Sequence, residues 1–481
     1  MVDDYLDLDK RILGEAYRST ETMNIVTTLC DEYDSRWPGS GNDKLACDYM
    51  AEKLRGYGLD GVHLEKFRIP GWIRGSSSLS VLEPKKRRID CIALPMSAEG
   101  VVESELVYLG SGPVDTYEER REEIEGKIVM VNSSNPEGMK RYLHRSEKYQ
   151  RSIISGAAGW IFMNHYPAYG PPTGGVSPII PAVGVSYEDG MYLARQLDLK
   201  GRVKLRLEAT CKNLDVDTWN VVAEIRGTDS TDKWVVYGAH YEGHDISVGA
   251  LDDATGAACV MEIARILSKE REHLKRNIRF ILFGAEEIGL YGSRAYVEAH
   301  PDEVSKIRFM LNFDAAGRAG RQGFCLHGWP QLEEVFQEVK DAIGSDIPIW
   351  RQVSPYSDHW PFLLEGVATA TMGDPAEAQR RGGRGFGHTK FDTVDKADLR
   401  AQRECVANAA LAAIRLLNID EWPAGHRSQE EINELVRQQD FEQTLAVGKR
   451  LKEYLEERRG ELRPETLVYL DRLSGDWDEV I

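Results

Sequence analysis

Histidines and paired acids recur through the second half of this chain, each close to an apolar stretch. In chain order they are His240, Asp252 with Asp253, Glu286 with Glu287, Asp314 and His388. Imidazole and carboxylate groups together are typical ligands of zinc, for which cobalt or manganese can substitute. One histidine and one acid for each of two ions, with one acid shared, is the ligand set of a two-metal hydrolase. A further carboxylate beside the ions could take a proton from the attacking water.

The adjacent acids need an explanation of their own. Asp252 and Asp253 lie side by side in GALDDATGA, where an apolar stretch turns into a helix. A helix N-cap needs only one aspartate, so we expect the other to bind something else. Glu286 and Glu287 in FGAEEIG follow an apolar stretch, and their side chains must diverge toward different partners. The structural alternative is that an acidic pair stabilises a helix start through the helix dipole.

The segments that carry these residues alternate between two patterns. Apolar stretches predict strands, and helical spacing predicts helices between them. The predicted strands are 234–240, 277–287, 308–317 and 366–374, and the predicted helices are 253–268 and 331–342. This alternation favours an α/β fold with a mixed, largely parallel sheet flanked by helices. Ligands of such sheets gather beyond the carboxyl ends of the strands, where the first histidine and the acids fall.

The rest of the chain divides into segments that differ in composition and in the spacing of their apolar residues. Residues 20–33 and 42–56 predict amphipathic helices, the second from the helical spacing of its apolar residues Leu45, Tyr49, Met50 and Leu54. A small inserted α/β domain is predicted from strands and helices that alternate without any cluster of metal-type ligands. Beyond it and the main strands, a charged tail with helical apolar spacing predicts a helical extension. The predicted boundaries are 1–74 (N-terminal part of the catalytic domain), 75–208 (insert), 209–420 (main catalytic domain) and 421–481 (helical C-terminal extension).

Composition narrows the classes of partner and location. The 481 residues carry a formal net charge of −18, which argues against nucleic acid or an anionic membrane as a main partner. The N-terminus lacks a signal-peptide pattern, and no apolar stretch approaches the length of a membrane span. Seven cysteines stand singly without a CxxC pair, which is typical of reduced thiols. We therefore expect a cytoplasmic protein.

Six motifs together resemble the M28 family of zinc metallopeptidases, which includes aminopeptidases and glutamate carboxypeptidases. They are GAHYEGHD, GALDDATGAA, FILFGAEEIGLYGSRAYV, NFDAAG, SDHWPF and GHTKFDTVDK, and they lie in order between residues 234 and 399. Residues 20–75 are similar to the family's N-terminal part. The insert, with GKIVMVNSS, GAAGWIFMN and IPAVGVSYEDG, resembles the protease-associated (PA) domain. The resemblance implies a zinc-exopeptidase-like fold of the phosphorylase/hydrolase type.

The resemblance also implies a role for each motif residue. His240, Asp252 and Asp314 would hold one divalent ion, most naturally zinc, and Asp252, Glu287 and His388 would hold the other. Asp252 would thus bridge the two ions.

The acids beside these ligands would have other tasks. Glu286 would be the general base, and Asp253 would cap the helix that begins at Ala254. The family further implies a cis peptide bond between Asp252 and Asp253.

Three supporting positions follow from the same motifs. Glu242 stands where the family usually has an aspartate that orients the first histidine, and a longer acid leaves its contact with the imidazole open. Asp358 and His359 in SDHWPF would support the ligands from behind. Tyr356 is a candidate donor to the oxyanion.

The direction of hydrolysis depends on the remaining candidates. Arg380, Arg381 and Arg384 in QRRGGRGFGH, and Arg351, could bind a substrate carboxylate, although a solvated basic loop is the simpler interpretation. We weigh an aminopeptidase, a carboxypeptidase or other amide hydrolase acting on acidic substrates, and a non-catalytic binding protein. An excess of acids in the cleft and retention of all ligands favour an aminopeptidase acting on peptides or small amides. A homodimer is expected from the PA and helical appendages.

Overall fold

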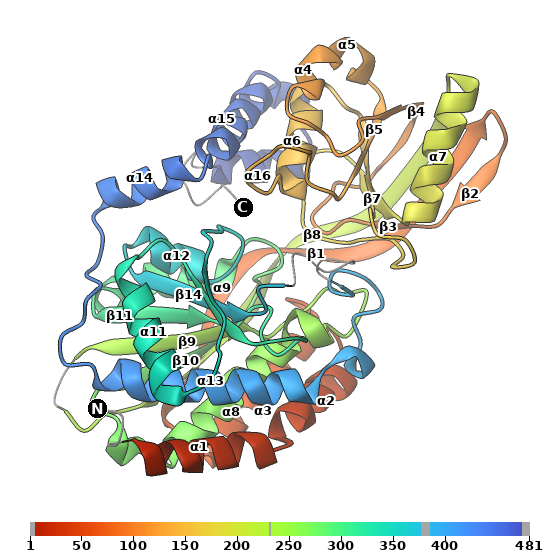
Figure 1. The fold of residues 1–481 in the computed structure, drawn as a ribbon. Helices are drawn as coiled ribbons and strands as arrows, with labels where there is room; N and C mark the ends of the chain where they lie inside the picture. Colours follow the sequence, from red (N-terminus) through yellow and green to blue (C-terminus); the bar gives the residue numbers. More distant parts are fainter. Residues whose placement is uncertain (1–4, 230–231, 377–384, 474–481) are drawn as a thin grey trace. The chain divides into compact units, whose positions relative to one another are not determined.

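The computed structural model describes residues 5–229, 232–376 and 385–473. Contacts within the chain divide it into two compact units (Figure 1). The first consists of the chain up to Ile69 and most of Val216–Leu435. The second consists mainly of Pro70–Asp215 and the chain from Val436 onward.

The first unit is built on a mixed, largely parallel sheet. Its strand order is β13-β12-β14-β11-β9-β10-β8. β9 lies parallel to β10 and β11, β11 to β14, and β12 to β13, whereas β8 with β10 and β12 with β14 are antiparallel. The bounds are β8 Lys204–Ile225, β9 Trp234–His240, β10 Asn277–Phe283, β11 Ile307–Asn312, β12 Gly323–Leu326, β13 Ile349–Arg351 and β14 Ala368–Gly373. The predicted sheet is therefore confirmed.

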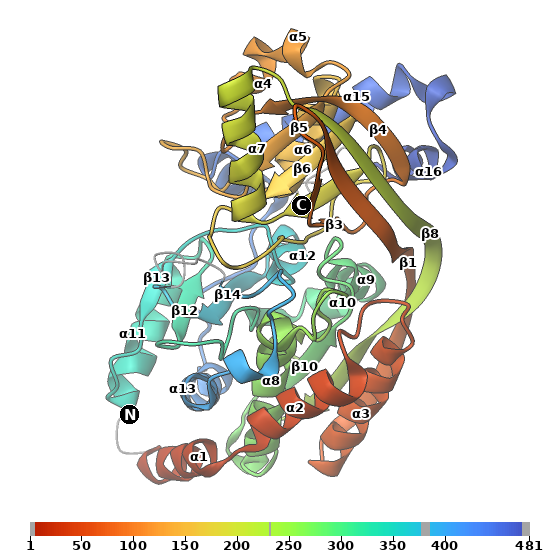
Figure 2. The same cartoon turned by 90° about the vertical axis from the view of Figure 1, so that its right-hand side faces the viewer.

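Helices cover both faces of this sheet, which is why its central strands are buried throughout and mostly apolar. Every residue of β9 and β10 is buried. On one face lie α1 (Leu6–Arg18), α2 (Glu21–Tyr33), α3 (Asn42–Gly56), α8 (Thr255–Ser268) and α13 (Leu399–Asn418) (Figure 2). On the other lie α9 (Tyr291–Ala299), α10 (Pro301–Val304) and α12 (His359–Leu364), and α11 (Gln331–Ile343) packs against β12 and β13. Phe283 and Met310 of the sheet meet Tyr296 and Phe362 in one core cluster.

The carboxyl ends of the parallel strands meet at one edge. β9 ends at His240, β10 is followed by Gly284 and Ala285 before the paired glutamates, and Asp314 comes two residues after β11. Because the strands run in the same direction, these side chains are brought to the same edge of the sheet.

The second unit contains a smaller sheet, in the order β8-β4-β5-β6-β7-β3. β4 to β7 are parallel to one another, and β8 and β3 are antiparallel at its two edges. The strands are β3 Cys91–Ala93, β4 Gly100–Tyr108, β5 Ile128–Asn132, β6 Gly159–Met163 and β7 Ala182–Val185, with β1 Asp60–Glu83 and β2 Arg87–Ile89 pairing beside them. The helices are α4 Thr116–Glu119, α5 Arg121–Ile124, α6 Arg145–Ile154 and α7 Tyr187–Lys200. The predicted small α/β insert is present.

The C-terminal part of the chain is helical, as predicted. Its helices are α14 Gln429–Gln438, α15 Glu442–Glu456 and α16 Pro464–Arg472. Val447, Leu451 and Leu455 of α15 share a buried core with Trp160 and Phe162 of β6. The apolar face of the tail is therefore covered within the second unit.

Two expectations from composition can be compared with the structure. All seven cysteines are free thiols. Among the described residues, none of the helices combines the length and apolar content needed to cross a membrane.

Candidate metal centre

His240, Asp252 and Asp314 form a first cluster of ligand-type side chains. One ligand atom from each lies within 4.8 Å of the others. His240 Nε2 is 3.4 Å from Asp252 Oδ1 and 4.0 Å from Asp314 Oδ1. The other ring nitrogen, Nδ1, lies 3.1 Å from the backbone oxygen of Glu242 and can donate to it. That bond leaves Nε2 facing the carboxylates, as a metal-ligating imidazole requires.

Two buried side chains shape the loops of this cluster. The Arg36 guanidinium donates to the carbonyls of Tyr241 at 2.5 Å and Gly249 at 2.9 Å, which ties the two ends of the loop after β9 together. Asp392 accepts hydrogen bonds from the N–H of Leu251 at 2.6 Å and of Asp252 at 3.1 Å. The peptide bond between Asp252 and Asp253 is cis, as predicted.

The predicted helix cap at Asp253 is wrong. Helix α8 begins at Thr255, its N-cap is Ala254, and no side chain caps it. Asp253 has non-helical backbone angles (φ −134°, ψ 42°) within a wide turn. It therefore lies one residue before the N-cap of α8 and does not occupy the capping position. Its carboxyl is buried, and burial raises its pKa well above the usual range. A Cβ at Gly256 would lie 2.2 Å from Asp253 Oδ2, so this glycine makes room for the carboxyl.

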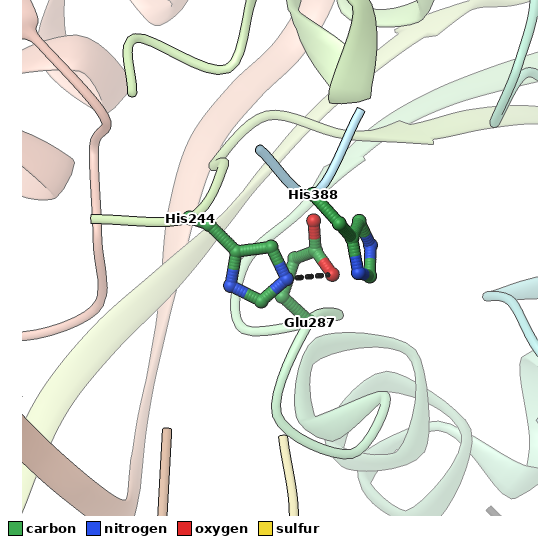
Figure 3. Close-up of side chains that lie close together, drawn as sticks. All are labelled: His244, Glu287 and His388. Carbon is green, nitrogen blue, oxygen red and sulfur yellow. Dashed lines mark ion pairs between the residues drawn. The ribbon is translucent and has the colours of Figure 1, made fainter. Parts of the chain in front are cut away.

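A second cluster consists of His244, Glu287 and His388 (Figure 3). One ligand atom from each again lies within 4.8 Å of the others. His244 Nε2 is 2.9 Å from Glu287 Oε2, and both side chains are buried. The sequence predicted Glu287 and His388 as ligands of one ion, and His244 was missed. Its only sequence signal is the second histidine in HYEGH.

The donor sets of the two clusters fit a pair of divalent ions. Each set combines imidazole nitrogen with carboxylate oxygen, the ligand types that zinc takes in proteins. Three protein ligands per cluster leave a position for water or substrate, which distinguishes a catalytic from a structural zinc site.

Arg318 is a further site residue that the sequence interpretation missed. Its Nη2 donates to Asp252 Oδ1 at 2.8 Å and to Asp314 Oδ1 at 2.9 Å, and its Nε donates to the Leu251 carbonyl at 2.6 Å. The side chain is buried. It draws the two carboxylates of the first cluster together and offsets part of their charge. The signal was an arginine four residues after Asp314 in NFDAAGRAG.

Glu242 has a different partner from the one the motif suggests. Its Oε1 accepts hydrogen bonds from the backbone N–H groups of Glu286 and Glu287, the latter at 3.2 Å. Its Oε2 is 3.9 Å from His240 Nδ1, too far for a hydrogen bond. The longer acid therefore holds the turn that carries both glutamates, and its own carbonyl orients the histidine.

Glu242→Asp is consequently expected to impair any hydrolysis at the two clusters although it restores the residue usual for the motif. The shorter side chain cannot reach the two N–H groups, and loss of such a supporting partner typically costs about 10- to 100-fold in activity. Glu242→Gln keeps an acceptor oxygen at the same reach and should lose less. Steady-state kinetics with metal analysis of both variants tests this. An aspartate variant more active than the glutamine variant would contradict it.

Glu286 belongs to neither cluster but lies among the acids. Burial of its carboxyl raises its pKa well above the usual range, and the charges of Asp314, Glu287 and Asp358 raise it further. Since bound cations favour the ionised form of a nearby carboxyl, metal binding would oppose this shift.

The remaining candidates lie outside the two clusters. Asp358 is fully buried, and burial raises its pKa to about 7. His359 Nε2 is 2.8 Å from the Ser354 carbonyl, its ring stacks on His327, and burial lowers its pKa to about 4. It is therefore a neutral, buried ring.

Tyr356 and four arginines are the candidate substrate-binding residues. Tyr356 is half-buried, and its backbone N–H lies 3.4 Å from Ser354 Oγ. Arg351 is exposed at the end of β13 and forms an ion pair with Glu333. Arg380, Arg381 and Arg384 lie outside the described residues.

Comparison with known proteins gives two domain matches. The model of Peptidase family M28 matches residues 220–413, and that of the PA domain matches residues 102–193. Carboxypeptidase Q of Mus musculus is 27% identical over 451 residues, which are 87% of this chain and 91% of that protein.

Solved structures share the fold. A peptidase M28 precursor from Shewanella amazonensis SB2B has a TM-score of 0.76 at 23% identity, covering 89% of this chain and 99% of that one. A zinc aminopeptidase from Bacillus subtilis has a TM-score of 0.65 at 22% identity, covering 85% of this chain and 98% of that one. The similar proteins thus include one named as a carboxypeptidase and one named as an aminopeptidase.

Proposed function

The chain carries an M28 peptidase domain with an inserted PA domain, and from this premise we propose that it removes N-terminal residues from peptides at a two-metal centre. The observation that carries the proposal is the pair of ligand clusters, together with an additional glutamate, Glu286, among the neighbouring acids. A non-catalytic protein would have no need of that glutamate.

Zinc is the metal we propose for both positions. In this proposal His240, Asp252 and Asp314 hold one ion, and Asp252, Glu287 and His388 hold the other. The mixed imidazole and carboxylate donors support this choice. Zinc is also the metal named for the Bacillus subtilis aminopeptidase of the same fold. Bound ions would polarise the scissile carbonyl and make a water molecule more acidic.

Glu286 then acts as the general base. Its carboxylate accepts a proton from the attacking water and gives it to the departing amine nitrogen. Glu242 supports this role. Its carboxylate accepts hydrogen bonds from the backbone N–H groups of Glu286 and Glu287 and so fixes the position of the Glu286 backbone. The charge of the ions would keep the base ionised despite its burial.

The charges around the base favour attack on the N-terminal residue. Glu286 and Asp358 lie in neither ligand cluster, and a carboxylate that binds no metal can hold a substrate ammonium group beside the ions. Among the described residues, Arg36 and Arg318 are buried arginines of the site loops, and both are already engaged, Arg36 by backbone carbonyls and Arg318 by two carboxylates. Neither offers a free cation to a substrate carboxylate.

Substrate blocking tests this direction. We expect N-acetylation of a peptide to lower kcat/KM by about 100-fold, because a buried charged group loses its partner. C-terminal amidation of the same peptide should change it only a few-fold. The measurement is product formation from the free, acetylated and amidated forms of one peptide. If amidation is the damaging change and acetylation is tolerated, the protein is a carboxypeptidase.

We also place the protein in the cytoplasm as part of this proposal. Its support is that all seven cysteines are free, the state of thiols in a reducing compartment.

A further inference from the structure

His244 stands out because it joins a ligand cluster without being in the predicted ligand set. Its Nε2 lies 2.9 Å from Glu287 Oε2. Figure 3 shows its ring, the Glu287 carboxylate and the His388 ring facing one another. His244 and Glu287 are buried, with exposed fractions of 2% and 6%. A buried imidazole beside a ligand carboxylate is either a ligand itself or a hydrogen-bond donor to one.

We propose that His244 is a direct ligand of the ion that Glu287 and His388 hold, so that this ion has two imidazole ligands instead of one. The inference rests on the proposed two-metal centre, but it concerns the metal and not the peptide.

The distances suit a shared ion. In a tetrahedral zinc site with bonds of about 2.0–2.1 Å, neighbouring ligand atoms are about 3.3 Å apart. The 2.9 Å between His244 Nε2 and Glu287 Oε2 needs only a small adjustment to reach that value.

The backbone holds His244 in this position. Gly243 N–H donates to the Ser35 carbonyl at 2.8 Å, and the Trp37 ring lies 5.7 Å from the His244 ring, tilted by 30°. A Cβ at Gly243 would lie 2.6 Å from Gly249 Cα and 2.7 Å from the Asp252 carbonyl, so only glycine allows this close turn. The turn aims His240 and His244 at different clusters although they are four residues apart.

The two ions would then differ in their surroundings. The first cluster has one imidazole, and both of its carboxylates also accept hydrogen bonds from the Arg318 cation. The second has two imidazoles, which favour zinc and cobalt over manganese. A positive charge beside the first ion weakens its binding, since like charges repel. We therefore expect the second cluster to bind zinc more tightly and to fill first.

Zinc titration against a chelating dye separates a ligand from an orienting donor. His244→Ala and His244→Gln should both weaken the tighter zinc by more than about 100-fold, beyond the range for a partner that only supports a ligand. His300→Gln is the matched control. It removes a histidine 3.0 Å from Glu65 in the same unit, outside both clusters, and should leave both zinc ions bound as in the wild type.

Glutamine is the decisive variant because its amide can still donate to Glu287. If His244→Gln binds zinc within about 100-fold of the wild type, His244 only orients Glu287 and the proposal is overturned. Unchanged binding by both variants overturns it as well.

X-ray absorption of the unmodified protein loaded with one equivalent of zinc avoids any question of variant folding. Scattering from two imidazoles on that zinc supports the proposal, and scattering from one overturns it. Both experiments read metal binding alone. Zinc binding as expected, without cleavage of any peptide, would therefore contradict the proposed function and leave the inference about His244 intact.

Discussion

Glu286→Gln is expected to lower kcat by about three orders of magnitude while both metal ions stay bound. A positioned general base typically contributes about 10²- to 10⁴-fold, and glutamine cannot accept the proton of the attacking water. The side chain belongs to neither ligand cluster. The hydrogen bonds from the 286–287 backbone to Glu242 do not depend on the substituted group, so the turn should survive.

The measurement pairs kcat with the metal content per chain. Glu287→Gln, one residue away, is the matched control, because Glu287 lies in the second cluster and its loss should reduce metal content. Activity of Glu286→Gln near that of the wild type would remove it as the base. Loss of metal from this variant would show instead that Glu286 is a ligand.

The sheet that carries these residues could be predicted because its strands are buried on both faces. β9 has the bounds predicted for it, 234–240, and the predicted helix at 42–56 is α3. In α3, however, Met50 and Leu54 are buried whereas Leu45 is 54% exposed. Ala46 and Cys47 complete the buried face instead. The helical spacing thus predicted the helix correctly but did not predict which of its side chains are buried.

Several elements have weak local signals, so their presence or their full length could not be predicted from the sequence. β12 and β13 have only four and three residues, too few to show a period. β7 lies inside a Gly/Pro-rich stretch and pairs with both β6 and β3. The long strands β1 and β8 have many half-exposed polar residues, so no apolar stretch marks their length. These elements depend on tertiary pairing.

Some features of the candidate site could likewise be predicted from the sequence, and others could not. The types and order of most cluster residues can be read in the sequence. His240, Glu287 and Asp314 end or follow a strand, and Asp252 precedes a helix. The partners of Glu242, Arg318 and Asp392 cannot, because they depend on how loops distant in sequence approach one another. Asp253 failed as a predicted cap for a related reason: the wide turn before α8 shifts the cap by one residue.

Asp252→Ala is the second substitution with a large expected effect, and it addresses the shared ligand. We expect both ions to bind more weakly and the zinc content to fall well below two ions per chain, because each ion would lose a carboxylate from its ligand set. Arg318 would also lose its 2.8 Å contact with Asp252 and keep only Asp314 as a carboxylate partner. Its charge would then lie beside a weakened site.

Asp253→Asn is the control for this loss. Asp253 is equally buried and adjacent, but it lies in neither cluster, and asparagine matches its shape. This variant should keep both ions. Zinc analysis after gel filtration, with thermal unfolding of the metal-free proteins to compare their folding, decides the matter. If Asp252→Ala loses one ion and retains the other, Asp252 serves the first cluster alone and the second ion must be held by His244, Glu287 and His388 without it.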